Sequence, residues 1–458
     1  MTSDPEPAPF AGTPARPPWS HKLWMLAGSR ERFFERLIQD YGDFVEYRGP
    51  ISFYLVNHPA LVKQVLQGAH DTFDKNSPLY DRFRRAFGSG LVVAEGESWK
   101  RRRAAAQKVL GPRQVEGYCE LMVRAAEQAA ARWLPLCRRD ASFDIAPEMD
   151  RLTLEIIGRS LFQDGFDGAQ ESVQRWTHAI DHFSSKAPLP VIRSAWFPSP
   201  LNLRLERTVR EFHGFIQRML DSNRRDGSEG GLLSLLCGGG PDGEAAPLSD
   251  AEIRDEVLGM IVGGHETSSV ALTWAWYELD RNPAVEQRLL EELDTVLGDR
   301  PIESADVPRL TYTRMVIDET LRLHPPFWFE NRNVTREVEL GGATLRAGDT
   351  VAFSRYALHR HPGFWNDPEV FDPNRFSPGK EENRRSTYAY VPFGGGPRVC
   401  VGVHFAMQEL VVVLATLARK LRIRVDPRHR HEVRALLTMR PKHGLRVRVA
   451  QRQASSSR

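Results

Sequence analysis

The segment Phe393–Gly402 constrains the fold of this chain more than any other part of the sequence. It reads F-G-G-G-P-R-V-C-V-G, so three glycines and a proline precede Arg398 and Cys400. A thiolate held away from water needs positive charge and hydrogen-bond donors, and a glycine-rich turn lets backbone N–H groups face the sulfur. A helix expected after Gly402 would add the positive end of its dipole. Cys400 is therefore a candidate soft metal ligand, although a structural cysteine beside a flexible turn is the alternative.

A second constraint is one unusually long helix. Ser249-Asp250-Ala251-Glu252 forms a capping box. The helical pattern continues from there to Asn282-Pro283, roughly 32 residues or about 48 Å at 1.5 Å per residue. In its middle, Gly263 and Gly264 each cost about 1 kcal/mol relative to alanine. Either a flat ligand lies against the glycine backbone, or a neighbouring helix packs closely there.

Two pairs of polar residues lie on predicted helices. Glu266 and Thr267 follow the two glycines directly. A threonine can bond back to a carbonyl oxygen one turn earlier and open a groove that holds a water molecule, whereas the alternative for Glu266 is a solvated side chain. Glu319 and Arg322 are three residues apart on a later helix, so they share a face and can pair. Such a pair is usually an exposed ion pair that contributes about 0–1 kcal/mol.

Composition limits the class of protein. Hydrophobic residues make up 41% and charged residues 26%, which is ordinary for a globular protein and excludes a wholly disordered chain. A net charge of +3 gives no reason to expect nucleic-acid binding. The 458 residues suggest about three domains of about 150 residues, or one large domain. Four cysteines without a C-x-x-C pair exclude a disulfide scaffold and a zinc framework, and they fit a reducing compartment.

The two ends of the chain are polar or rich in proline. We expect residues 1–30 to form a flexible, proline-rich arm and residues 451–458 a disordered tail. The N-terminus lacks the basic and then apolar regions of a signal peptide, and no run of about 18 uncharged apolar residues occurs. These features predict a cytoplasmic protein with no membrane anchor, in which residues 31–450 form one domain.

The chain resembles the cytochrome P450 family. The pattern F-x-x-G-x-R-x-C-x-G matches at all six fixed positions, a coincidence expected on the order of once in 100,000 chains of this length. The glycine, acid and threonine of Gly263–Thr267 match the family's oxygen-binding helix motif. Glu319-x-x-Arg322 and Pro373-Asn374-Arg375-Phe376 match two further motifs, with Asn374 where the family often has glutamate. The resemblance implies a mainly α, triangular helical domain with a small β-rich portion.

The resemblance also implies residues that bind haem b. Cys400 would be the axial ligand of the iron, and Phe393 would pack near its sulfur. The other implied haem contacts belong to the cysteine loop, to a W-x-x-x-R motif and to an arginine after the E-x-x-R helix: Gly394, Arg398, Gly402, Trp99, Arg103 and Arg332. Glu319, Arg322 and Arg375 would form a buried structural triad.

The implied activity is monooxygenation. Dioxygen and two externally supplied electrons would hydroxylate or epoxidise an apolar small molecule, such as a terpenoid, polyketide or peptide secondary metabolite. Thr267 and Glu266 would be the catalytic residues, and a separate ferredoxin or flavodoxin with its reductase would supply a monomeric enzyme with electrons. Alternatives are oxidative coupling, desaturation or peroxide-driven oxidation, and more remotely a non-catalytic haem sensor. The intact Glu266–Thr267 pair favours oxygen activation.

Five residues are expected to line the substrate pocket: Gly263, Gly264, Phe83, Phe327 and Phe329. The run Phe327-Trp328-Phe329 departs from the mainly aliphatic or proline-rich sequence of many family members. It suggests a flat or bulky apolar substrate, although a role in the protein core is an equal alternative for each of these aromatic residues.

Two charged features have two interpretations each. Glu330 either faces the pocket, where it would bind an amine or hydroxyl, or turns outward and pairs with an arginine such as Arg332 or Arg336. We favour the outward position. Arg101 and Arg102 are either solvated or part of a basic patch on the proximal surface, where an acidic electron donor would dock.

Overall fold

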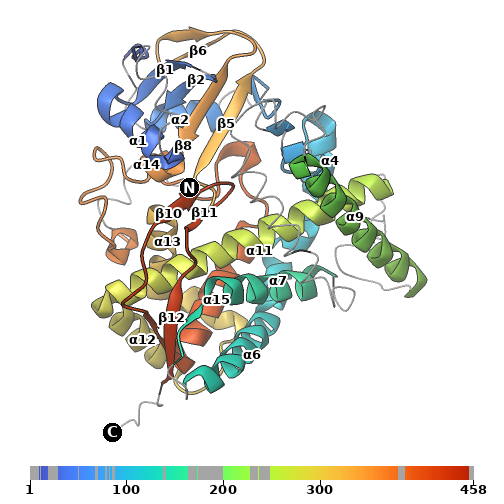
Figure 1. Cartoon of the computed structure of the whole chain (residues 1–458), viewed down its shortest axis with the longest axis vertical. Coiled ribbons are helices and arrows are strands. Elements are labelled where there is room, and N and C mark those ends of the chain that lie inside the picture. Colours follow the sequence, from blue (N-terminus) through green and yellow to red (C-terminus); the bar gives the residue numbers. More distant parts are fainter. Residues whose placement is uncertain are drawn as a thin grey trace.

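This computed structural model describes residues 10, 12–18, 29–49, 51–67, 71–77, 80–81, 83–84, 88–137, 141–162, 173, 200–226, 236, 248–379 and 387–452. The described chain is mainly α-helical with a smaller β-rich portion, as expected. A β-rich lobe lies at one end, and helix α11 crosses the larger helical part below it (Figure 1). None of the described helices is long and apolar enough to cross a membrane.

The helices and strands have the following bounds. The α-helices are α1 (Arg30–Tyr41), α2 (Pro59–Leu66), α4 (Gly96–Leu110), α5 (Pro112–Gly117), α6 (Cys119–Cys137), α7 (Ala146–Phe162), α9 (Pro200–Asp226), α11 (Asp250–Arg281), α12 (Pro283–Leu297), α13 (Thr311–Leu323), α14 (Arg355–Leu358) and α15 (Val403–Lys420). Short 3₁₀ helices are η3 (Ser304–Arg309), η4 (Pro373–Phe376), η6 (Thr387–Ala389) and η7 (Gly396–Arg398). The strands are β1 (Phe44–Arg48), β2 (Ser52–Val56), β3 (Phe73–Asp74), β4 (Phe143–Asp144), β5 (Phe329–Val334), β6 (Val338–Leu340), β7 (Ala343–Leu345), β8 (Thr350–Ser354), β9 (Leu421–Val425), β10 (Val433–Ala435), β11 (Met439–Pro441) and β12 (Arg446–Gln451).

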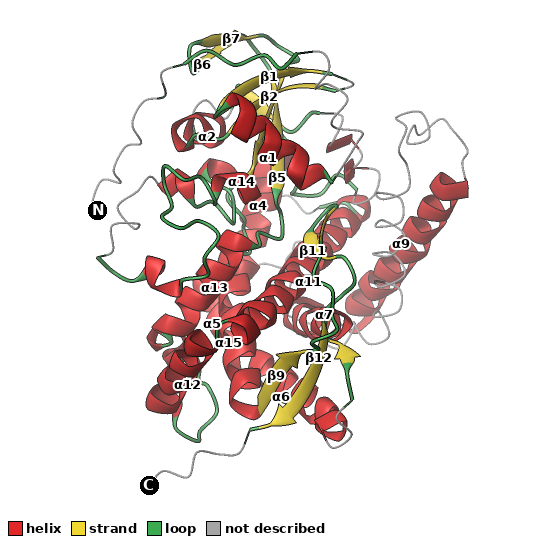
Figure 2. Ribbon diagram, turned by 60° about the vertical axis from the view of Figure 1, so that its left-hand side comes forward, coloured by secondary structure: helices red, strands yellow, loops and turns green. Residues whose placement is uncertain are grey.

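The main sheet belongs to the β-rich lobe and has five strands in the order β1-β2-β8-β5-β3. Strands β2 and β8 are parallel, and the other neighbours are antiparallel. Helices α1, α2 and α14 lie around this sheet (Figure 2). Gly341 and Gly342 join β6 to β7 with φ values of 54° and 78°, which a hairpin of this kind requires of glycine. Three-stranded β4-β12-β9 and the pair β10–β11 lie elsewhere in the fold.

Part of the expected N-terminal arm is held against the main sheet. Ala15 bridges Val45, and its N–H donates to the carbonyl oxygen of Phe44 at 2.9 Å. Arg16 pairs with Glu46 at 2.6 Å. These contacts join Ala15 and Arg16 to strand β1, and the flexibility of the arm as a whole stays a prediction. Residues 1–9 of the arm and 453–458 of the tail lie outside the described residues, while Gln451 belongs to strand β12.

Helix α11 is the central element of the helical part. It has 32 residues, and the expected capping box at Ser249 and Glu252 is present at its start. From Val270 to Leu279 every residue is buried, because helices α7, α13 and α15 pack around this stretch. A helix buried on all sides is apolar all round rather than amphipathic, and this burial fixes where its earlier turns present Gly263 and Thr267.

Two arginines of α4 dock that helix onto the start of α11. Arg102 is buried and donates to Glu256 at 2.6 Å, and both Arg101 and Arg102 pair with Glu252. Arg102 therefore cannot contribute to an electron-donor patch, because it is buried and paired with two carboxylates of the long helix. Arg101 is partly exposed and pairs with Glu252, and its part in such a patch stays a prediction.

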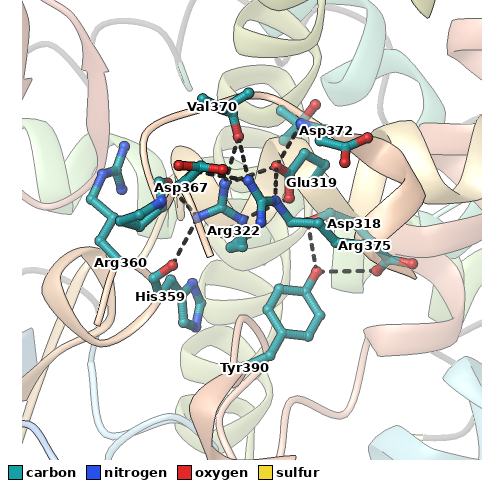
Figure 3. Close-up of polar contacts among 12 residues, drawn as sticks. Asp318, Glu319, Arg322, His359, Arg360, Asp367, Val370, Asp372, Arg375 and Tyr390 are labelled. Atoms are coloured by element: carbon teal, nitrogen blue, oxygen red, sulfur yellow. Dashed lines mark hydrogen bonds and ion pairs between the residues drawn. The ribbon is translucent and has the colours of Figure 1, made fainter. Parts of the chain in front are cut away.

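The three residues of the implied triad lie together (Figure 3). Arg322 donates to the two carboxylate oxygens of Glu319 at 2.6 and 2.8 Å, and Nε of Arg375 donates to Glu319 at 3.2 Å. All three side chains are buried. The remaining guanidinium N–H groups donate to backbone carbonyl oxygens, including those of Pro368 and Val370. The triad thus ties α13 to the chain between His359 and Phe376, which leads toward the cysteine loop.

A buried carboxyl lies between α15 and α11. Glu409 is fully buried, and neither of its oxygens has a hydrogen-bond partner among the described residues. Its polar neighbour is the hydroxyl of Ser268 on α11, which has no close partner there either. Burial raises the pKa of Glu409 to about 8, so the carboxyl is mainly neutral at pH 7.

The triad generates a stability prediction. Glu319→Gln keeps the shape of the side chain but leaves Arg322 and Arg375 buried without an anion. We expect the free energy of unfolding in urea to fall by about 3–5 kcal/mol. Arg314→Ala on the same helix is the control, because Arg314 is half exposed and pairs with Asp318 at 2.9 Å; it should cost about 0–1 kcal/mol. Equal losses in the two variants would contradict a structural role for the triad.

Glu409 generates a prediction of pH dependence. Its pKa is raised from 4.5 in the unfolded chain to about 8 in the folded protein, so its contribution to stability is fully present below pH 4.5 and is lost as the pH rises through 8. Across this window the loss is about 1 kcal/mol per pH unit. Glu409→Gln cannot titrate, so the variant should gain stability relative to the parent between pH 6 and 9. If the free energies of unfolding of the variant and the parent differ by the same amount at pH 6 and at pH 9, a raised pKa of Glu409 is excluded.

Candidate active site

The cysteine loop is a tight turn that only glycine permits at two positions. The N–H of Cys400 donates to the carbonyl oxygen of Phe393 at 2.9 Å, which closes the loop. Gly394 and Gly396 have φ values of 78° and 63°. A Cβ at Gly396 would lie 2.1 Å from the carbonyl oxygen of Leu66. The loop therefore packs directly against the end of α2, and this close approach fixes the position of Cys400.

The thiol of Cys400 has the environment of a ligand rather than of a core cysteine. The side chain has the accessible surface area of an exposed residue. Protein nevertheless surrounds it closely enough that burial raises the pKa of the thiol. A thiol that faces an internal space has both properties. The N–H of Gly402, at the start of α15, donates to the sulfur, and this hydrogen bond and the positive charge of Arg103 both lower the pKa of the thiol.

Trp99 and two arginines form a stack beside the cysteine. Trp99 and Arg103 share one face of α4, with the guanidinium of Arg103 5.8 Å from the indole ring and that of Arg398 4.1 Å from it. Arg103 donates to the carbonyl oxygen of Val399 at 2.8 Å, next to Cys400. Arg398 donates to the carbonyl oxygen of Ala94 at 2.7 Å and pairs with Glu95. The structure thus brings these three implied haem contacts together.

Glu330 is buried between two arginines. It pairs with Arg332 and with Arg355, and all three side chains are buried. Burial alone would raise the pKa of Glu330, but Arg332 and Arg355 hold it at about 2. The favoured outward position is therefore wrong, although pairing with Arg332 is present; Arg336 instead pairs with Asp71 at 3.2 Å. Residues 330 and 332 share a face of β5, which directs both side chains inward.

Lys75 belongs to the same charged region, and no sequence pattern indicated it. Burial and the nearby charge of Arg332 lower its pKa to about 7. Its ammonium group donates to the carbonyl oxygen of Val92 at 2.9 Å and lies 5.5 Å from the ring centre of Tyr80. Strand β3 pairs with β5 at Asp74 and Asn333, and this pairing brings Lys75 beside Arg332. Only the long-range register of the sheet could have identified it.

The middle of α11 has an accessible stripe within an otherwise buried helix. Gly263 is exposed and Gly264 and Thr267 are partly exposed, whereas the residues between and after them are buried. Thr267 donates to the carbonyl oxygen of Gly263 at 2.6 Å, as a back-bonded threonine does. A Cβ at Gly263 would meet no atom within 4 Å, but one at Gly264 would lie 2.8 Å from Ile157 of α7. Close packing against α7 therefore explains why position 264 is a glycine. Packing does not explain the glycine at position 263, where the space beside the backbone is open.

Glu266 faces a different element from Thr267. It is 3% exposed, accepts a hydrogen bond from Thr438 at 2.8 Å and pairs with Arg440 of β11. The Glu266 carboxylate is therefore not solvated, and an arginine balances its charge. Its neighbour His265 is buried and contacts the carbonyl oxygen of Ile261 at 2.7 Å, as a core histidine does.

Two of the three expected pocket aromatics lie together. The rings of Phe83 and Phe327 are 6.4 Å apart, and Phe83 lies 5.7 Å from Tyr80. Phe327 also faces the guanidinium of Arg355 at 5.2 Å. Phe329 instead stacks on Phe34 of α1 at 4.7 Å. It therefore contributes to the core between α1 and the main sheet.

The residues around Cys400 fit a haem with its cysteinate. Five cations, Lys75, Arg103, Arg332, Arg355 and Arg398, face two carboxylates, Glu95 and Glu330. This excess of positive charge suits a group that brings a thiolate and two propionates to the site. A soft thiolate donor is also the ligand type that haem iron accepts in this class of site.

Comparisons with known proteins agree with this geometry. The family model described as Cytochrome P450 matches residues 12–446. Cyclooctatin synthase of Streptomyces melanosporofaciens is 37% identical over 396 residues, with 84% of each chain covered. Pentalenene oxygenase of Streptomyces avermitilis is 33% identical over 447 residues, covering 96% of this chain and 98% of the relative.

A solved structure supports the same conclusion. The crystal structure of the cytochrome P450DA heme domain superposes with a TM-score of 0.83 and 26% sequence identity, covering 98% of both chains. Members of the family carry haem b with a cysteinate ligand. The match of sequence and fold over nearly the whole length shows that this chain belongs to the cytochrome P450 family and is a haem-dependent monooxygenase.

Proposed function

We propose that this monooxygenase hydroxylates or epoxidises a cyclic terpenoid, and that separate electron-transfer proteins reduce it. The observation that carries the substrate class is the pair of relatives named cyclooctatin synthase and pentalenene oxygenase, which match most of the chain. The facing rings of Phe83 and Phe327 support it, because aromatic walls suit a bulky apolar molecule.

The haem site in this proposal uses the residues around the cysteine loop. The thiolate of Cys400 would bind the haem iron, and Gly402 and Arg103 would stabilise this thiolate form. Trp99, Arg103, Arg332 and Arg398 would bind the propionates, and we add Lys75 to this set because of its place beside Arg332. Haem b, when bound, supplies the redox chemistry that activates dioxygen.

The remaining roles belong to the long helix. The back-bond from Thr267 to Gly263 opens a groove on the accessible face of α11. In the proposal, this groove holds a water molecule and Thr267 orients it, while Glu266 is the acid from which protons reach the groove. The electron donor is a ferredoxin or flavodoxin with its reductase, and the enzyme acts as a monomer.

Loss of the thiolate tests the haem assignment. The ferrous carbonyl complex of the purified protein should show the red-shifted Soret band of a cysteinate-ligated haem. Cys400→Ser should lose that band because a hydroxyl is a poor anionic ligand. Cys119→Ser is the control, since Cys119 is buried away from the loop and burial raises the pKa of its thiol to about 11. A wild-type protein without the band would overturn the assignment.

Binding of a terpene tests the substrate class. Pentalenene should displace water from the haem and shift the Soret band of the ferric protein in a titration. Phe327→Ala should weaken this binding by about 10- to 100-fold, the value of one buried aromatic contact. An open-chain fatty acid such as lauric acid is the comparison ligand. A larger shift with lauric acid than with pentalenene would contradict the proposed substrate class.

A further inference from the structure

Arg355 lies at a junction of three parts of the fold. It is the first residue of α14, and it is only 2% exposed. Its Nε donates to the carbonyl oxygen of Val391 at 2.8 Å, one terminal nitrogen donates to that of Phe327 at 3.1 Å, and the other pairs with Glu330. The guanidinium thus joins the chain before the cysteine loop, the segment expected to line the pocket and the charged strand β5.

Both backbone polar groups of Val391 are held by side chains. Val391 is buried and belongs to no helix or strand, so these groups need partners from elsewhere. Its N–H donates to Nε2 of His359 at 3.0 Å, and its carbonyl oxygen accepts from Arg355 and from the N–H of Gly394, the latter at 3.0 Å. The carbonyl oxygen of His359 accepts in turn from Arg322 of the triad at 2.9 Å (Figure 3). Helix α14 and the residue after it therefore fix the entrance to the cysteine loop.

Arg355 acts on the cysteine site through its charge and not as a ligand. A Cβ at Gly394 would lie 3.5 Å from a terminal nitrogen of Arg355, so the guanidinium lies against the loop. Its positive charge is among those that lower the pKa of the Cys400 thiol. All three of its nitrogens already donate to protein groups. Arg355 is therefore distinct from the residues proposed to bind the propionates.

The burial of this cation depends on Glu330. The carboxylate pairs with Arg355, and its pKa of about 2 keeps it ionised at pH 7. A buried ion pair adds little net stability, because removing two charges from water costs about as much as their attraction returns. A neutral amide side chain carries two N–H groups and could bond two carbonyl oxygens without that cost. The positive charge at position 355 is therefore better explained by its effect on the cysteine site than by stability.

We propose that Arg355 is a positioning residue of the haem site, whose guanidinium fixes the cysteine loop against the pocket segment and whose charge favours the reduced state of the bound haem. The proposal rests on the proposed place of the haem at Cys400. One-electron reduction lowers the charge of the site by one, so a nearby cation favours the reduced state and a nearby anion opposes it. Arg355 and Glu330 should therefore shift the reduction potential in opposite directions.

The first experiment measures the midpoint potential of substrate-free holoenzyme variants by spectroelectrochemical titration at pH 7. Arg355→Met should make reduction about 10-fold less favourable, which is about 59 mV toward lower potential for one electron. Glu330→Gln should raise the potential, because it removes a carboxylate that is ionised in the parent. The double variant removes both charges and should return the potential to near the parent value. Shifts of the same sign in the two single variants would overturn the role of the charge.

The second experiment follows amide hydrogen exchange in peptides that cover residues 391–402. The N–H groups of Gly394 and Cys400 close the loop through hydrogen bonds within it. Arg355→Lys keeps the charge, but an ammonium group lacks the planar fork that reaches two carbonyl oxygens and a carboxylate. This variant should keep a potential near that of the parent, while exchange in the loop becomes about 10-fold faster. Parent-like exchange in both Arg355→Lys and Arg355→Met would exclude the positioning role.

Arg360→Met is the matched control. The Arg360 side chain is 9% exposed, follows α14 and pairs with Glu369 at 3.1 Å. This variant should change neither the potential nor exchange in the loop. An Arg355→Met variant that behaves like Arg360→Met in both measurements would overturn the proposal.

The outcomes also distinguish this inference from the proposed function. A parent protein without the thiolate carbonyl band would remove the haem assignment at Cys400 itself. A parent with that band, but with unchanged potentials in the variants, would overturn the role of Arg355 alone. Should Arg355→Met fail to bind haem, Glu330→Gln still tests the charge and Arg355→Lys still tests the positioning. An unchanged potential in the first, or unchanged loop exchange in the second, would then contradict the proposal.

Discussion

A thiolate cannot be held within a protein unless positive charge is held there with it, and the fold around Cys400 follows from that requirement. The cations come from five separate parts of the chain: Lys75 after β3, Arg103 on α4, Arg332 on β5, Arg355 on α14 and Arg398 in the cysteine loop. No local segment could collect them. The β-rich lobe and the helical part must therefore keep a fixed relation, because each contributes charges to the same site.

The buried triad is one of the interactions that keeps this relation. Glu319 and Arg322 belong to α13, and Arg375 belongs to η4, which follows the irregular chain after α14. Their guanidinium groups also satisfy backbone carbonyl oxygens of that irregular chain, which has no helix or sheet partner for them. A segment without regular structure thus obtains its hydrogen bonds from two side chains. Glu319 pairs with both buried cations and so offsets their mutual repulsion.

Local patterns predicted the elements of this fold better than the partners of its charged residues. The capping box located the start of α11, and the spacing of Trp99 and Arg103 placed them on one helix face. These features depend on neighbours within a few residues. The ion-pair partners of Glu330, Arg101 and Arg102 depend instead on tertiary packing. Each of these three residues pairs with an opposite charge that is more than 20 residues away in the chain, and Glu330 also lies on the inner face of a strand. Sequence spacing shows neither feature.

The same limit applies within the catalytic motif of the long helix. The sequence places Gly263, Gly264, Glu266 and Thr267 in one run, as though they served one purpose. The structure divides them, because residues that are adjacent in a helix face different neighbours. Gly264 meets α7, Gly263 and Thr267 face the accessible stripe, and Glu266 meets the hairpin of β10 and β11. Adjacent residues of one motif thus meet different parts of the fold, and Arg440, which pairs with Glu266, belongs to no pattern around the motif.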